Sequence, residues 1–225
     1  MNSDNTILQT LEESVFSKDI ERVSLVVSRI DIQSYSPTEI INALSRGIEK
    51  AREYFKNGIF SIPDLLVAID AYRHGINYLK EIAPKLMNQK TEDGKPRVVI
   101  GVVEGDVHDM GKNIVAAVLE ASGYHVYDLG RNVPNETFLE TIRSTKADIL
   151  ALSTMMSTPL ANMRILIEMT KTTYPHTAII VGGAPFDADL ARRMGADGYA
   201  ENAITAPDET NKLLISFASD KKLIK

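Results

Sequence analysis

The chain of 225 residues has no cysteine and only four histidines. Without cysteine there are no disulfides, thiolate metal sites or cysteine nucleophiles, so histidine and the carboxylates are the strong metal ligands that remain. No apolar run approaches the ~18 residues of a membrane span, and the amino terminus lacks the basic and apolar segments of a secretory signal. These absences lead us to expect a cytoplasmic protein with no membrane partner.

The chain also carries little excess charge of either sign. Its formal net charge is −5, and no basic arm or helix-turn-helix pattern is present, so nucleic acid is not an expected partner. A hydrophobic fraction of 44% with 24% charged residues is typical of a globular protein. The length allows one large or two modest domains.

The first 83 residues show helical periodicity with no intervening strand. Apolar residues recur at helical spacing over 6–17, 19–30, 36–56 and 61–79. Ser36, Pro37 and Glu39 form a capping-box pattern at the start of the third segment. Residues 1–83 are therefore predicted to form a four-helix bundle, and the polar stretch 84–96, PKLMNQKTEDGKP, to be an interdomain linker.

From Arg97 onward short apolar runs alternate with amphipathic segments. The runs predict strands over 98–103, 125–129, 149–153, 178–181 and 198–200, and helices over 112–121, 135–145, 159–173, 185–194 and 203–218. Repeated strand–helix units predict an α/β domain over 97–225. The expected fold is Rossmann-like (flavodoxin-like), with a doubly wound parallel five-stranded sheet.

The stretch 105–115, GDVHDMGKNIV, follows the first predicted strand and presents His108 between two aspartates. Open α/β sheets bind ligands at this carboxyl edge. A lone imidazole is a poor start for a zinc site, but it suffices as the axial ligand of a metal that a macrocycle already holds. Asp106 is placed to accept the other ring N–H. The alternative is a solvated histidine at the start of the next helix.

Two further loops belong to the same edge of the predicted sheet. Residues 152–159 bring hydroxyls and thioethers after the third strand, and Gly182-Gly183 follows the fourth. Each loop alone is ordinary, because hydroxyls cap helices and glycines make turns. Together they predict a deep slot lined by small groups.

These motifs, in this order and spacing, resemble the cobalamin-binding proteins: the cobalamin module of methionine synthase and, more closely, the small corrinoid proteins of anaerobic methyltransferase systems. The resemblance covers nearly the whole chain. The matching residues are the signature Asp106-x-His108-x-x-Gly111, Ser153-x-Met155 in place of Ser-x-Leu, and the double glycine Gly182-Gly183.

The resemblance implies that the chain binds cobalamin or a related corrinoid, with His108 as the lower axial ligand of cobalt. The other cofactor-binding residues that it implies are Asp106, Asp109, Met110, Gly111, Ser153, Met155, Ser157, Thr158, Gly182 and Gly183. The family joins a hydroxyl to the aspartate–histidine pair, and that position holds Pro159 here, with Ser157 and Thr158 nearby. In the bundle, Phe55 and Ile62 match the pair that covers the methyl group on the upper face of the corrin.

The resemblance further implies a methyl carrier without activity of its own. It would work between a substrate-demethylating methyltransferase and an acceptor methyltransferase, with a reductive activating protein as a further partner. Methanol, a methylated amine or a methoxylated aromatic (an O-demethylase system) are the expected donors, and tetrahydrofolate or coenzyme M the expected acceptors. The alternatives are the cobalamin subunit of a radical mutase, a cobalamin-dependent sensor or regulator, and a receiver-like domain without cofactor.

Overall fold

The computed structural model describes residues 4–30, 34–82 and 94–223. Contacts divide the chain into two compact units, Met1–Gly94 and Lys95–Lys225. Most of the stretch 84–96, the predicted linker, lies outside the described residues. Within the described residues, no helix is long and apolar enough to cross a membrane.

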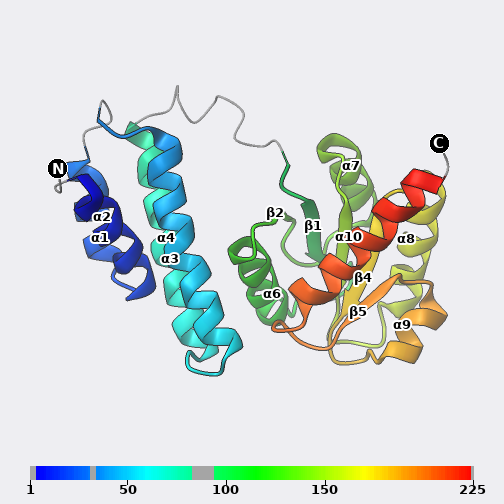
Figure 1. The fold of residues 1–225 in the computed structure, drawn as a ribbon. Coiled ribbons are helices and arrows are strands. Elements are labelled where there is room, and N and C mark those ends of the chain that lie inside the picture. The colour runs from blue at the N-terminus through cyan, green and yellow to red at the C-terminus, as the bar shows by residue number, and fades with distance from the viewer. Residues whose placement is uncertain (1–3, 31–33, 83–93, 224–225) are drawn as a thin grey trace. The chain divides into compact units, whose positions relative to one another are not determined.

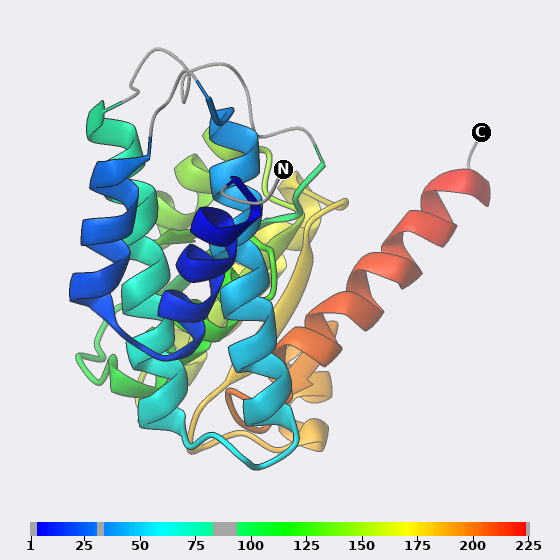
Figure 2. The same cartoon turned by 60° about the vertical axis from the view of Figure 1, so that its left-hand side comes forward.

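The first unit is a bundle of helices, as the periodicity predicts (Figure 2). Its helices are α1 (Asp4–Phe16), α2 (Ile20–Arg29), α3 (Pro37–Lys56) and α4 (Ile62–Ile82). Helix α1 packs against α3, and α2 against α4. The core is built from the apolar stripes of the helices, with Leu11, Val27, Leu44 and Ile69 all buried.

The starts of α3 and α4 are capped by side chains, and the cap of α3 is the one that its sequence predicts. Ser36 and Glu39 form a capping box on α3, in which the Glu39 N–H donates to Ser36 Oγ (3.2 Å) and the Ser36 N–H to Glu39 Oε2 (2.8 Å). At α4, Asp64 accepts from the Ser61 N–H (2.9 Å) and pairs with Lys18 (2.6 Å). The hydrogen bond from Lys18, followed by those from Ser61, holds the pKa of the Asp64 carboxyl well below its usual range.

The second unit is a parallel sheet with helices around it (Figure 1). Its strand order is β2-β1-β3-β4-β5. The strands are β1 (Arg97–Val102), β2 (His125–Asp128), β3 (Ile149–Ser153), β4 (Ala178–Gly182) and β5 (Gly198–Ala200). The helices between and after them are α6 (Met110–Ala121), α7 (Asn135–Thr145), α8 (Leu160–Thr173), α9 (Ala188–Met194) and α10 (Ala206–Leu223). This confirms the predicted Rossmann-like fold, and it places the switch in strand order between β1 and β3.

Side chains alternate between the two faces of the sheet, and each face has its own core. Val98 and Ile100 pack with α6 and α10 on one face, whereas Val99 and Leu150 pack with α7, α8 and α9 on the other. Figure 1 shows α10 in front of the sheet and α7 and α8 behind it. The three inner strands β1, β3 and β4 are therefore buried on both sides, which explains their continuous apolar runs, whereas the edge strands β2 and β5 are at most half-buried.

Helix α9 is shorter than its apolar pattern predicts. It begins at Ala188 rather than near 185, because residues 183–186 form a turn in which the Phe186 N–H donates to the Gly183 carbonyl oxygen (3.1 Å). Asp187 then caps the helix by accepting from the Leu190 N–H (2.6 Å). Periodicity alone does not distinguish this turn from a first helical turn.

Candidate functional site

The loop after β1 buries a carboxylate at the switch point of the sheet. Asp106 has no exposed surface, and its two oxygens have separate sets of partners. Oδ1 accepts from the backbone N–H of His108 (2.9 Å) and lies 2.7 Å from His108 Nδ1. Oδ2 accepts from the Thr154 hydroxyl and the Met155 N–H, each at 2.6 Å. The carboxylate thus joins the loop after β1 to the loop after β3.

These contacts decide the charge of Asp106. Burial alone raises the pKa of its carboxyl, but the hydrogen bonds from Thr154, from the backbone of His108 and Met155, and from the imidazole outweigh burial. The pKa of Asp106 is held well below its usual range, so the group is a carboxylate at neutral pH. A charged acceptor is the usual partner that orients a metal-binding imidazole.

The imidazole of His108 faces outward from this buried anchor. Its side chain is 59% exposed, and its Nδ1 is the nitrogen beside Asp106, which leaves Nε2 as the ring nitrogen available to a ligand. Val107 and Met155 on the same two loops, and Met110 at the start of α6, expose their apolar side chains. An available imidazole among exposed apolar groups fits a metal held in a largely apolar macrocycle better than a bare ion.

Thr154 is the residue of this site that the motifs of the sequence did not single out. Counting along the family's pattern places Pro159 at the hydroxyl position, with Ser157 and Thr158 nearby, whereas among the described residues Asp106 takes its hydroxyl contact from Thr154. Thr154 directly follows β3, next in the sheet to β1. The signal that could have found it is therefore sheet register, because neighbouring parallel strands end side by side.

Gly183 is required by the close approach of a second loop to Thr154. Its φ is +117°, and a Cβ at this position would lie 1.8 Å from the Thr154 carbonyl oxygen. The Thr154 N–H also donates to the Gly182 carbonyl oxygen (3.2 Å). The absence of a side chain at Gly183 therefore lets the β4–α9 loop pack directly against Thr154, the residue that donates to Asp106.

Small residues form a row across the carboxyl ends of the strands. Register pairs Val102 with Ser153, Ser153 with Gly182, and Gly182 with Ala200. By alternation the row faces the same side as Ile100, the side covered by α6 and α10. Apart from buried Val102, its members are half-buried. Small groups thus stand where the sequence predicts a slot, and the slot itself stays a prediction.

The remaining predicted residues fall into two places. Asp109 precedes α6 without making a side-chain cap, and Gly111 lies in the first turn of that helix with open space around its Cα. In the first unit, Phe55 is buried in the bundle, whereas Ile62 opens α4 and is 38% exposed. Their predicted role as a cover for a methyl group stays a prediction.

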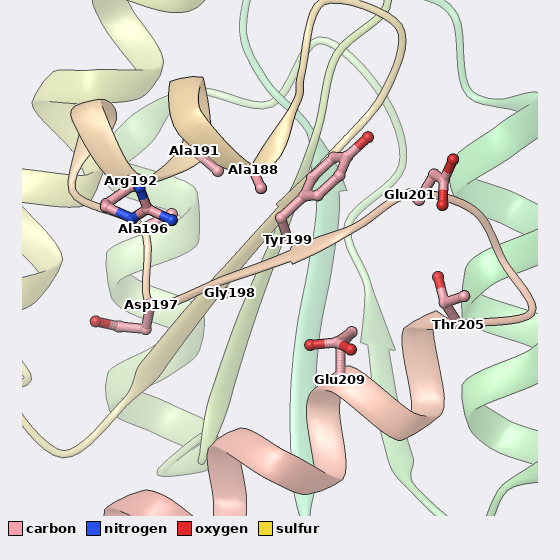
Figure 3. Close-up of a pocket in the computed structure, with 10 residues that line it drawn as sticks. All are labelled: Ala188, Ala191, Arg192, Ala196, Asp197, Gly198, Tyr199, Glu201, Thr205 and Glu209. Atoms are coloured by element: carbon pink, nitrogen blue, oxygen red, sulfur yellow. The ribbon is translucent and has the colours of Figure 1, made fainter.

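A pocket of about 420 Å³ lies elsewhere in the second unit, where α9, β5 and α10 meet (Figure 3). Figure 3 shows Tyr199 from β5 and Glu209 from α10 among its lining residues. None of the predicted cofactor residues lines it. This pocket is therefore separate from the His108 site.

Comparison with known proteins points to one family. Residues 96–208 match the model of the B12 binding domain. Dimethylamine corrinoid protein 1 of Methanosarcina mazei is 36% identical over 219 residues, which cover 96% of this chain and 99% of that protein. Dimethylamine corrinoid protein 2 of Methanosarcina acetivorans is 35% identical, with the same coverage of both chains.

Two solved structures are similar in fold and in sequence. The methanol:cobalamin methyltransferase complex MtaBC of Methanosarcina barkeri matches with a TM-score of 0.83 and 27% identity, over 98% of this chain and 85% of the other. A cobalamin-binding protein of Desulfitobacterium hafniense matches with a TM-score of 0.63 and 28% identity, over 92% of this chain and 98% of the other.

Proposed function

The chain belongs to the family of corrinoid proteins with a B12 binding domain, as its motifs predicted, and from this premise we propose that it carries a methyl group on a bound corrinoid between two methyltransferases. The observation that carries the proposal is the exposed imidazole of His108, fixed through Nδ1 to a buried carboxylate at the switch point of the sheet.

In this proposal His108 binds the cobalt of the corrinoid through Nε2. Asp106 holds the ring in one orientation and makes the ligating nitrogen more basic. Thr154 and Met155 keep Asp106 ionised by donating to its second oxygen. The exposed side chains of Val107 and Met110 lie against the macrocycle. The row of small residues Ser153, Gly182 and Ala200 contacts the nucleotide tail of the cofactor.

The bound corrinoid supplies the methyl-transfer chemistry, which is a property of the cofactor rather than of protein side chains. The protein ligates it, orients it and shields it, and Phe55 and Ile62 are the proposed cover of its methyl group.

Two similarities support a carrier and its class of donor. Relatives named dimethylamine corrinoid proteins match along 96% of this chain, so the similarity extends over both of its units. This extent favours a carrier over a mutase subunit that has only the cofactor domain. A methylated amine is the first donor to test, and methanol the second because of the similarity to the MtaBC complex. Tetrahydrofolate and coenzyme M are the acceptors to compare.

The absorption spectrum of the protein loaded with methylcobalamin tests whether His108 is the axial ligand of cobalt. His108→Ala is expected to keep part of the corrinoid and to lose the absorption of the histidine-bound form. His176→Ala, which removes another exposed histidine of the second unit, is the matched control and should leave the spectrum unchanged. Identical spectra for His108→Ala and the wild type would refute the assignment. Transfer assays with candidate amine and methanol methyltransferases then test the donor.

A further inference from the structure

Asn132, in the β2–α7 loop, makes two hydrogen bonds to the loop that presents His108. The Gly105 N–H donates to Asn132 Oδ1 at 2.8 Å. The Asn132 N–H donates to the carbonyl oxygen of Asp106 at 2.9 Å. One residue thus binds the backbone just before Asp106 and just after it, on the stretch that leads to the imidazole.

Asn132 has the backbone conformation that this double contact needs. Its φ is +51°, in the left-handed region, which asparagine tolerates better than most residues. Its neighbours are tied to β1, because the Val133 N–H donates to the Val102 carbonyl oxygen (3.0 Å) and the Val102 N–H to that of Gly130 (2.9 Å). The backbone on either side of Asn132 is therefore hydrogen-bonded to β1, which fixes the position of the Asn132 side chain.

The contacts of Asn132 complement those of Thr154. Thr154 and Met155 hold the carboxylate of Asp106, whereas Asn132 holds the backbone around it. Gly105 has φ +90° and no side chain to restrain it. One other backbone bond, from the Asp106 N–H to the Val103 carbonyl oxygen (3.2 Å), closes the turn. Removing the Asn132 amide leaves the Gly105 N–H without this acceptor.

We propose that Asn132 is a positioning residue for His108, holding the backbone of residues 105–106 so that the imidazole is kept in its ligating orientation. This inference rests on the proposed function, in which His108 binds cobalt. Asn132 itself touches neither the metal nor the macrocycle in this proposal.

Three variants of the full chain distinguish the effect of the Asn132 side chain from the effect of its left-handed backbone conformation. Asn132→Gly removes the acceptor and keeps the left-handed conformation, whereas Asn132→Asp keeps both. Lys146→Gly is the matched control, because Lys146 is also left-handed (φ +53°) and caps the far end of α7. Each variant is loaded with methylcobalamin, and the ratio of histidine-ligated to histidine-free corrinoid on the protein is measured from its spectrum at one fixed pH.

Asn132→Gly is expected to lower this ratio by about twofold to tenfold, the change that one lost hydrogen bond brings. Asn132→Asp and Lys146→Gly are expected to stay within about twofold of the wild type, less than the loss of a hydrogen bond. Equal ratios for Asn132→Gly and the wild type would overturn the inference.

Hydrogen exchange of the unloaded full chain provides a readout that does not depend on the cofactor. Asn132→Gly should speed exchange of the amides of Gly105 and His108 and leave the amides within β3 unchanged, which also shows that the sheet is folded. Unchanged exchange at both loop amides would overturn the inference as well. If the wild type and His108→Ala have the same spectrum, the proposed function is what fails, and the exchange rates then decide by themselves whether Asn132 holds the loop.

Discussion

Replacing Thr154 with valine tests how strongly the buried carboxylate depends on its hydroxyl donor. Valine is β-branched like threonine, so the change removes the hydrogen bonds of Thr154 Oγ1 with little change in the shape of the side chain. These are the short bond to Asp106 Oδ2 (2.6 Å) and the longer contacts with the N–H and the carbonyl oxygen of Met156 (3.2 Å each). A hydrogen bond to a charged group contributes about 1.5–3 kcal/mol. Oδ2 keeps the Met155 N–H as a donor, so we expect the free energy of unfolding to fall by about 2 kcal/mol, the middle of that range.

Two other buried threonines of the second unit provide a scale for this change. Thr177 donates to the backbone carbonyl of Ala147 (2.8 Å), a neutral acceptor, so Thr177→Val should cost about 1 kcal/mol. The buried hydroxyl of Thr170 has no hydrogen-bond partner among the described residues, so Thr170→Val should cost nothing or stabilise the unit. The expected order of loss is Thr154→Val, then Thr177→Val, then Thr170→Val.

Native-state hydrogen exchange of the amides within β1 and β3 measures these differences, since the most protected amides of a sheet report global opening of their own unit. The unloaded protein is used, so that bound corrinoid does not add its own stabilisation. A loss for Thr154→Val no larger than that for Thr177→Val would refute the reasoning. It would mean that the backbone donors alone hold the carboxylate.

Three further changes test other parts of the fold. Gly183→Ala places a Cβ 1.8 Å from a backbone carbonyl oxygen and should destabilise the second unit by about 3 kcal/mol. Gly123→Ala is the control, because Gly123 is also left-handed but has open space around it, and it should cost about 1 kcal/mol. Equal losses by hydrogen exchange would contradict the steric cause. The side chain of Lys112 is 1% exposed and pairs with Asp128 (2.5 Å). Asp128→Asn should lower the free energy of unfolding by about 3 kcal/mol and Lys112→Met by less, because only the first variant leaves a buried charge unpaired. The reverse order in urea unfolding would argue against this reasoning. The pKa of Asp64 is lowered in the folded state, so its stabilisation of the bundle is present above its unfolded pKa of about 3.9 and is lost as the pH falls further. Asp64→Asn should therefore lower the melting temperature at pH 7 and have little effect near the folded pKa. A constant difference in melting temperature across pH would exclude this linkage.

The helices and strands were predictable because their signals are local. A period of 3.6 residues marked the four bundle helices, and short apolar runs marked the strands, with ends a few residues from those observed. The pairing of Asp106 with His108 was predictable for the same reason, since only Val107 lies between the two partners in the loop. The start of α9 was not, because a turn and a first helical turn share the same apolar spacing near Pro185.

The residues around Asp106 show where local reasoning stops. Thr154 lies 48 residues from Asp106 along the chain, and only the pairing of β1 with β3 brings them together. Counting along the motif led instead to Pro159 and its neighbouring hydroxyls. Asn132 reaches Gly105 across 27 residues, from a loop without a recognisable motif.

The sequence by itself thus determined the two kinds of unit, the family, and the histidine that the site presents. It did so because periodicity and the Asp-x-His-x-x-Gly signature are written in neighbouring residues. Only the tertiary structure decided which hydroxyl holds Asp106, why Gly183 has no side chain, and which residue grips the loop from the other side. These depend on strand order and register, which bring the ends of distant segments within hydrogen-bond distance, and no local pattern of residues specifies that distance.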